Sequence, residues 1–520
     1  MKLKKLISVL SAITMLAGSA NCIVSAAAKG AGDVDQNGKV EIADAIMLAR
    51  WLAEDDITVT TAGLSDADLT GDGIVTADDQ AKLLCWLAGV EQNDPQPQER
   101  RSVDLLSGIE QGEVTKLAPA AAEFTAAQAK FSADLLREIQ DAEEDKDKNL
   151  LLSPVSVSLA LGMTMNGAKG QTLEEMQKVL GDDLTAEKLN QYYAGWSYQL
   201  LQPNLISFWD YDENGNIKRF DAESTPITIA NAIWFRDNEQ MIHVPQSFLQ
   251  TTADYYKAGA FKAPFNQSTV DDINGWCFEN THHMIPNVID YLPEDAVMVL
   301  ANALTFEDNW AEVYEEYQVR DETFHASNGK NHDVEMMSAT ENVYLHDDKA
   351  TGFIKSYRDP RYSFAAVLPN EDVSLDEYIA SLDGEKLWNL TESKEHCEVI
   401  TKMPKFQFDY ELNMNDTLKA LGMPTAFMPG IADFTGLNDL EDMPTWIGKV
   451  IHKTHIDLSE TGTKAAAVTA VIMEAGCALD PDKPEPKEVI LDRPFLFMIM
   501  DNTTGLPIFI GTVKDIQPAE

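Results

Sequence analysis

The chain reads Glu460-Thr461-Gly462-Thr463-Lys464-Ala465-Ala466-Ala467-Val468-Thr469-Ala470-Val471-Ile472-Met473-Glu474-Ala475-Gly476-Cys477 near its C-terminal end. Every second residue from Thr463 to Met473 is small or apolar, whereas the alternate positions include Lys464 and Glu474. One face of this segment therefore suits a core and the other suits water, as in a strand that joins a sheet. The run is also compatible with an ordinary buried strand or an alanine-rich helix, because short apolar runs do not distinguish the two.

Several other stretches accompany this segment in order along the chain. They are Asn149–Ser156, Gly167–Thr172, Leu300–Phe306 with Trp310, Met403–Phe406, Ala432–Gly436, Val489–Ile499 and Pro507–Gly511. Together they resemble the landmarks of the serpins, a family of suicide inhibitors of proteases. In this resemblance the hinge of the reactive-centre loop is formed by Glu460, Gly462, Thr463, Ala465, Ala466 and Ala467.

The resemblance implies an α+β domain with three β-sheets, about nine helices and an exposed reactive-centre loop. The residues themselves agree with a mixed fold. Phe124 to Ile139 predicts a helix with one apolar side, and Ile227 to Phe235 and Val297 to Phe306 predict buried strands. We find no Gly-x-Ser-x-Gly, His-Glu-x-x-His or Walker motif in the sequence, and we expect a protein that is not an enzyme.

The resemblance implies that inhibition works through a conformational change of the cleaved loop. A serine protease attacks the loop and forms an acyl-enzyme, and the cut loop enters the main sheet as a new strand. The family spacing from Gly462 predicts the scissile bond between Gly476 and Cys477, with Ala475 and Ala478 as alternatives because the stretch before Pro494 is unusually long. Small residues at the cut favour an elastase-like or subtilisin-like protease.

The resemblance also assigns residues that control loop entry. A buried polar gate beneath the sheet would be formed by Ser153, Ser156, Asn302 and His452. Trp310 and Glu460 would lie where the loop first enters. We expect Thr463 to be the first residue that faces inward, since a charge there would oppose insertion.

Two acidic segments near the N-terminus have the oxygen pattern of calcium loops. The ligands predicted in the first are Asp33, Asp35, Asn37, the Lys39 carbonyl, Glu41 and Asp44. Those in the second are Asp68, Thr70, Asp72, the Ile74 carbonyl, Thr76 and Asp79. Each loop precedes a helical pattern, and two loops in tandem predict two structural Ca²⁺ ions.

This duplicated loop–helix pattern resembles a type I dockerin, a small all-α module that binds a cohesin domain of a scaffoldin. By analogy the cohesin-binding residues would be Ile42, Ala43, Arg50, Trp51, Ala77, Asp78, Cys85 and Trp86. A module this short buries little apolar surface, so we expect the ions to contribute directly to its folding.

Composition and termini agree with an exported protein. The 520 residues carry a formal net charge of −45, which argues against nucleic acid or an anionic membrane as a partner. Lys2, Lys4 and Lys5 precede an apolar run that is too short to span a bilayer, as in a secretory signal. We expect a signal peptide at 1–28, a dockerin-like module at 31–90, a linker at 91–100 and a serpin domain at 101–518, in a secreted protein associated with a scaffold or the cell surface.

Other functions remain compatible with these patterns. The serpin-like part can be a non-inhibitory binding module, or an inhibitor that acts on cysteine proteases. Dockerins also accompany enzymes such as glycoside hydrolases, although the serpin-like landmarks occupy the space that a catalytic domain would need.

Overall fold

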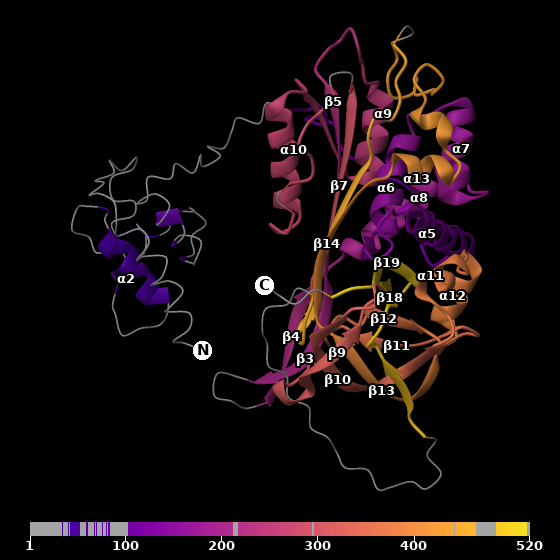
Figure 1. Cartoon of the computed structure of the whole chain (residues 1–520). Helices are drawn as coiled ribbons and strands as arrows, with labels where there is room; N and C mark the ends of the chain where they lie inside the picture. Colours follow the sequence, from indigo (N-terminus) through magenta and orange to yellow (C-terminus); the bar gives the residue numbers. More distant parts are fainter. Residues whose placement is uncertain are drawn as a thin grey trace. The chain divides into compact units, whose positions relative to one another are not determined.

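The computed structural model describes residues 34, 40, 42–52, 59–60, 67, 69, 75, 80 and 82–83 near the N-terminus, and residues 102–211, 217–285, 287–293, 296–440, 443–463 and 485–516 beyond them. The chain divides into two compact units, residues 1–100 and 101–520 (Figure 1). Each unit has its own hydrophobic core.

The first unit contains helix α2 (Ile42–Leu52), which lies where a helix is expected after the first acidic loop. Its residues Ala45 and Leu48 are buried in a small core together with Val34, Val40, Val59, Ala67 and Leu83. Gln80 Nε2 donates a 2.9 Å hydrogen bond to the Ala45 carbonyl, so the two repeats contact each other. Asp44, in the first turn of α2, is fully buried.

Nine α-helices lie within the described residues of the second unit. They are α5 (Ala122–Ala142), α6 (Pro154–Met165), α7 (Gly170–Gly181), α8 (Ala186–Leu201), α9 (Gln246–Thr251), α10 (Gln267–Asn280), α11 (Leu375–Ala380), α12 (Gly384–Glu392) and α13 (Asn415–Ala420). Short π and 3-10 segments occur at Thr252–Tyr256, Glu316–Gln318 and Pro424–Phe427. No helix in the described part of the chain combines the length and apolarity needed to cross a membrane.

Local sequence explains where the central helices begin and which side they bury. Helix α5 covers the predicted helix and buries Phe124, Phe131 and Leu135, as their spacing indicates. Helix α6 begins after Ser153, whose hydroxyl accepts a hydrogen bond from the Ser156 amide. Every residue of α6 is buried, so this helix lies inside the domain.

The largest sheet has the strand order β17-β13-β10-β11-β12-β18-β19-β2, with β9 beside β10. Its strands are β2 (Leu150–Leu152), β9 (Val319–His325), β10 (Asn331–His346), β11 (Ala350–Ser356), β12 (Tyr362–Pro369), β13 (Glu395–Pro404), β17 (Lys487–Ile490), β18 (Phe495–Asp501) and β19 (Leu506–Val513). Strands β12, β18 and β19 are buried along their whole length, so the middle of this sheet belongs to the hydrophobic core of the domain.

A second sheet is divided into two halves, β1-β6-β5-β7 and β14-β15-β16-β8. Their strands are β1 (Val103–Asp104), β5 (Ile227–Arg236), β6 (Gly259–Ala263), β7 (Met298–Phe306), β8 (Asp308–Asn309), β14 (Phe406–Asn413), β15 (Ile451–Leu458) and β16 (Gly462–Thr463). A separate hairpin consists of β3 (Asn204–Tyr211) and β4 (Ile217–Ser224). The described strands thus form four hydrogen-bonded sheets rather than the three expected, because one sheet is divided and the hairpin stands apart.

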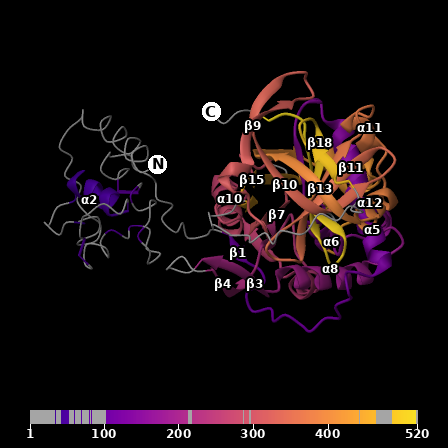
Figure 2. The ribbon, with the colours of Figure 1, turned by 90° about the horizontal axis from the view of Figure 1, so that it is seen from below.

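The division of this sheet lies between β7 and β15. Within the described residues, the halves touch at a parallel bridge between Leu300 and Val450. At the other end, β16 lies between β15 and β8, the strand that follows β7 along the chain. Helix α10 packs on one face of β5 and β7, and α6 and α8 lie on the opposite side (Figures 1 and 2). Strand β7, one wall of the gap, is therefore covered on both faces of the sheet.

Candidate functional site

The hinge segment forms one short strand at the end of this gap. Strand β16 pairs with β15 through Thr463 and Leu458, and with β8 on its other edge. Gly462 has φ +154°, and a Cβ on it would lie only 2.2 Å from the Asp308 carbonyl oxygen. A glycine is required here because the neighbouring backbone approaches too closely for any side chain.

Thr463 faces the interior of the domain and is only 3 % exposed. Its hydroxyl lies 2.6 Å from the hydroxyl of Tyr357, and the Tyr357 ring stacks on Trp310 at 4.5 Å between centroids. Trp310 is fully buried and donates from its backbone amide to the Thr461 carbonyl and from Nε1 to the Ser459 carbonyl, both at 2.9 Å. Three aromatic and hydroxyl groups thereby hold the start of the loop in the sheet.

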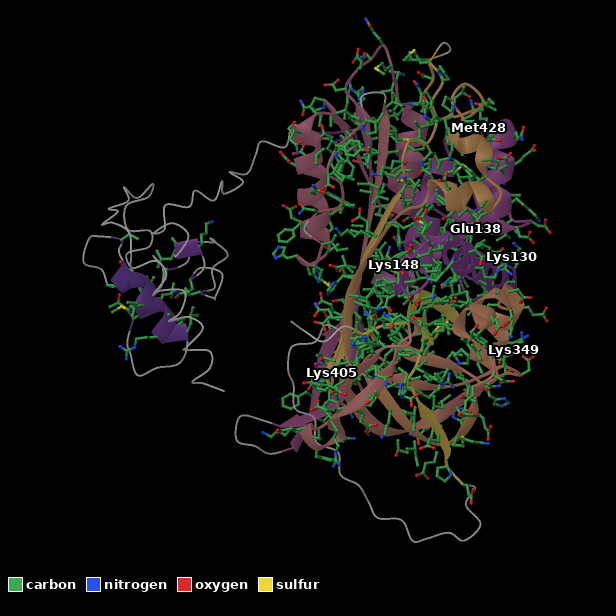
Figure 3. All side chains as sticks on the ribbon, in the orientation of Figure 1. Lys130, Glu138, Lys148, Lys349, Lys405 and Met428 are labelled. Atoms are coloured by element: carbon green, nitrogen blue, oxygen red, sulfur yellow. The ribbon has the colours of Figure 1, made fainter. Side chains whose placement is uncertain are left out.

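Glu460 is held by side-chain and backbone contacts. Its carboxylate lies 2.8 Å from the ammonium of Lys405, which also contacts Glu335 at 3.2 Å. Lys405 lies between β13 and β14 and is labelled in Figure 3. Partial burial alone would raise the pKa of Glu460, but the hydrogen bond from Lys405 and its charge bring that pKa below its usual value. The Tyr314 amide donates to the Glu460 carbonyl at 3.0 Å.

The four predicted gate residues meet beneath the sheet, although they come from distant parts of the chain. The Ser153 amide donates to His452 Nε2 at 3.1 Å, and the Ser156 hydroxyl bonds to the side chain of Asn302. Asn302 in turn donates to Asn231, which lies directly opposite it on β5. The cluster therefore links α6, β5, β7 and β15 by hydrogen bonds.

His452 is the titratable member of this cluster. It is 5 % exposed, and burial lowers its pKa to about 4. Nε2 accepts a hydrogen bond and is therefore unprotonated, so the imidazole is neutral at physiological pH.

The gap is filled by side chains of its own walls. Leu304, Phe306, Ile456 and Thr463 line a cavity of only about 10 Å³ beneath β7 and β15. This volume barely accommodates one water molecule. A further strand can enter only if β7 and β15 first move apart.

Some predicted site residues lie outside the described residues. These are Gly476, Cys477, Ala475 and Ala478 at the expected scissile bond and Ala465, Ala466 and Ala467 in the hinge. Sequence reasoning also missed three residues that contact the site: Asn231, Tyr357 and Lys405. Asn231 is the one polar residue in the run 229–235 of β5, which was an available signal, whereas nothing local marks Tyr357. Lys405 lies in the landmark stretch Met403–Phe406 but was given no role.

In the first unit, Asp44 is the predicted calcium ligand that the structure describes, and it is buried. The other predicted ligands lie outside the described residues, namely Asp33, Asp35, Asn37, Lys39, Glu41, Asp68, Thr70, Asp72, Ile74, Thr76 and Asp79. Of the predicted cohesin-binding residues, Ala43 and Arg50 are exposed on α2, Trp51 is half-buried and Ile42 begins the helix. The remaining four, Ala77, Asp78, Cys85 and Trp86, are also outside the described residues.

Comparisons with known proteins match both units. The family model for serpins (serine protease inhibitors) matches residues 126–516, and the model for the dockerin type I domain matches residues 31–84. A serpin-like protein of Thermococcus kodakarensis is 28 % identical over 74 % of this chain and 84 % of its own length. A leukocyte elastase inhibitor of Xenopus laevis is 28 % identical over 73 % of this chain and 96 % of its own. The crystal structure of the thermophilic serpin tengpin in its native state is similar with a TM-score of 0.71 and 38 % identity, over 80 % of this chain and all of that one.

Proposed function

The chain belongs to the serpin family and carries a dockerin type I domain, and on this premise we propose that it is a secreted inhibitor that traps a serine protease covalently. The trap is the insertion of the cleaved loop between β7 and β15. The dockerin domain attaches the inhibitor to a cohesin of a cellulosome-type scaffoldin.

One observation carries this proposal: the first described residues of the hinge, Gly462 and Thr463, already form a strand at the end of the gap. Thr463 pairs with Leu458 on one side and Asp308 on the other, and both pairings are antiparallel. Extending both ladders residue by residue brings Val471 level with Leu300 and Val450. These two residues bridge each other directly in the uncleaved chain, so β7 and β15 already have the stagger that one straight inserted strand requires.

The same register brings Thr469 between Asn302 and His452. Ala465 and Ala467 would face the apolar walls made by Phe306, Leu304 and their neighbours, where small side chains fit. The Thr469 hydroxyl would then lie beside the polar gate and could form hydrogen bonds with its side chains. Insertion therefore buries apolar residues against apolar walls and the single hydroxyl against the polar cluster.

The chemistry begins with the protease. Its serine oxygen attacks the carbonyl carbon at Gly476, the bond to the Cys477 nitrogen breaks, and the loop remains attached as an acyl-enzyme. Each backbone hydrogen bond gained on insertion contributes roughly 0.5–1.5 kcal/mol. About ten of them, with the buried apolar area, release on the order of 10 kcal/mol, enough to distort the attached protease before water hydrolyses the ester.

The expected target is a protease with a narrow primary pocket. Only small side chains surround Gly476, and the segment from Ala465 to Asp482 contains no Arg or Lys for a trypsin-like protease. The similarity to a leukocyte elastase inhibitor supports the same choice. We therefore assign an elastase-like or subtilisin-like target.

The dockerin domain is proposed to hold two structural Ca²⁺ ions. Asp44 fits a ligand role because a fully buried carboxylate requires a cation or several hydrogen bonds to offset its desolvation. Exposed Ala43 and Arg50 on α2 would contact the cohesin. A cohesin partner and the N-terminal signal pattern both imply an extracellular location.

A denaturing gel tests the inhibitory function. Incubation with elastase or subtilisin should give a band that survives boiling, at the mass of the protease plus the inhibitor without residues 477–520. The mass of the released C-terminal fragment should match a chain that starts at Cys477. Quantitative cleavage without any stable complex would show instead that the serpin fold serves here as a non-inhibitory module.

A further inference from the structure

A large open groove lies beside the hinge, on the outside of the domain. It has a volume of about 790 Å³ and is bounded by the segment Glu312–Gln318, by Ser338–Thr340 of β10 and by Ile400 of β13. This volume falls in the range that ligand and partner sites occupy.

The walls of the groove expose apolar side chains. Tyr317 is 74 % exposed and Ile400 is 41 % exposed. Ile400 lies directly opposite Thr340 in the ladder between β13 and β10, so it stands at the groove surface. Large apolar side chains that share one concave surface are typical of protein-binding sites.

The charge of the groove is negative. Glu312 is exposed at its rim and Glu315 is half-buried beside it. Lys355 is the one cation among the described residues that line the groove, and its ammonium lies 2.9 Å from the carboxylate of Glu341, with its side chain 3 % exposed. Because that pair neutralises itself, the groove presents carboxylates to a partner.

Backbone groups of β10 also open into the groove. Thr401 Oγ1 donates to the Ala339 carbonyl, which therefore points toward β13. Gln318 Nε2 donates to the Ser338 carbonyl, which points the opposite way. Since directions alternate along a strand, Thr340 also turns its amide and carbonyl away from β13. On that edge the described pairing of β10 with β9 ends at Met337, and the pairing with β11 starts at Tyr344. These groups are available to a partner.

One wall of the groove contacts the hinge. The Tyr314 amide, on the wall of the groove, donates to the Glu460 carbonyl in the hinge. The groove therefore adjoins the hinge, the segment that precedes the loop a protease would attack.

We propose that this groove is a second contact surface for the target protease, which accepts a basic surface segment carrying an exposed apolar side chain. The proposal rests on the inhibitory function proposed above. The apolar walls supply affinity, the carboxylates at the rim attract the basic segment, and the contact speeds the encounter that precedes attack on the loop.

The test uses the full chain and subtilisin or elastase whose active-site serine is blocked by a small sulfonyl fluoride, so that no loop is cut. Two variants alter the groove, Tyr317→Ser combined with Ile400→Thr, and Glu312→Gln. Tyr291→Ser is the matched control, because Tyr291 is 66 % exposed and does not line the groove. We expect the double variant to bind the blocked protease about tenfold more weakly and the control to bind normally. Glu312→Gln should reduce the dependence of binding on salt.

A second readout uses active protease. The double variant should inhibit about tenfold more slowly, with the same final yield of covalent complex. Equal binding of blocked protease by all variants would overturn the groove proposal even if trapping occurs. Self-association of the chain that the groove variants abolish would also overturn it, by identifying a second copy as the occupant. Binding without any covalent complex would instead sink the inhibitory function and leave the groove proposal standing.

Discussion

Gly462 and Thr463 show how two adjacent residues start a strand for different reasons. Gly462 is required by the approach of the Asp308 carbonyl, which excludes any Cβ. Thr463 is required by its surroundings, since its hydroxyl contacts Tyr357 and its side chain is buried. Gly462 lets the backbone approach β8 closely, and Thr463 fixes the backbone in the sheet through its buried hydroxyl.

Thr463→Arg should convert the inhibitor into a substrate. A buried guanidinium without a partner costs several kcal/mol, so the hinge would stay outside the sheet and the ester would be hydrolysed before insertion. The measurement is the yield of gel-stable complex per cleaved chain with elastase. Thr463→Ser, which keeps the hydroxyl, should retain most of the complex, and normal trapping by the arginine variant would contradict insertion from this end.

His452 should make stability depend on pH. Its pKa in the folded state, about 4, lies below the ordinary histidine pKa of roughly 6.5 that the unfolded chain has, so the unfolded chain binds more protons between these values. The stability that neutral His452 contributes is complete above about pH 6.5 and is lost as pH falls toward 4, by on the order of 3 kcal/mol.

Urea unfolding of the parent and of His452→Asn from pH 7.5 to 4 measures this contribution. The difference in unfolding free energy between the two proteins should shrink by that amount as pH falls. A difference that stays constant would mean that His452 does not remain neutral in the folded chain.

At the scale of elements, the divided sheet has a place for one more strand between β7 and β15, but in this structure the gap is closed. Strands β7 and β15 are already in register at both ends of the gap, but their walls leave almost no free volume. Insertion must therefore break the contact between Leu300 and Val450 before it gains new ladders. The polar gate, which ties α6 to β5, β7 and β15, sets part of that barrier.

Cleavage of the loop should make the protein much more heat-resistant. The inserted strand adds on the order of 10 kcal/mol of hydrogen bonding and burial, which corresponds to a rise in Tm of about 10 °C or more. Circular dichroism melting before and after a cut between Met473 and Ala478 measures it. If the Tm of the serpin domain did not change after this cut, insertion would not supply the driving force on which trapping depends.

At the scale of the whole molecule, two units with separate cores serve separate tasks. The dockerin domain spans only residues 31–84, a length at which a chain buries too little apolar surface to be stable without further support. The second unit has an extensive core of its own. Calcium should therefore matter to one unit and not to the other.

Removing calcium with EGTA should unfold residues 33–88 and leave trapping intact. Loss of the ions would leave the carboxylates of the two acidic loops clustered without the cations that hold them together. Hydrogen exchange read by mass spectrometry should show lost protection only in the first unit, while the yield of covalent complex with elastase stays constant. A chelator that also abolished trapping would show that the units depend on each other.

Local patterns predicted much of this structure. The apolar spacing from Phe124 predicted helix α5, and the run from Ile227 predicted strand β5. Each of these features follows from neighbours a few residues apart. The contacts of the site join residues far apart, such as Thr463 and Tyr357, which are 106 positions apart, and no local pattern reports such a pair.

The amino-acid order alone established the family, the hinge composition and the tandem acidic loops, because these are repeated or ordered motifs whose chemistry is carried by single residues. Folding in three dimensions established the closed gap with its fixed stagger, the hydrogen bond of Thr463 to Tyr357, the place of Asn231 in the gate and the acidic groove beside the hinge. The physical reason is that strand register and side-chain packing depend on which distant segments become neighbours, and that is set by the balance of burial and hydrogen bonding over the whole domain.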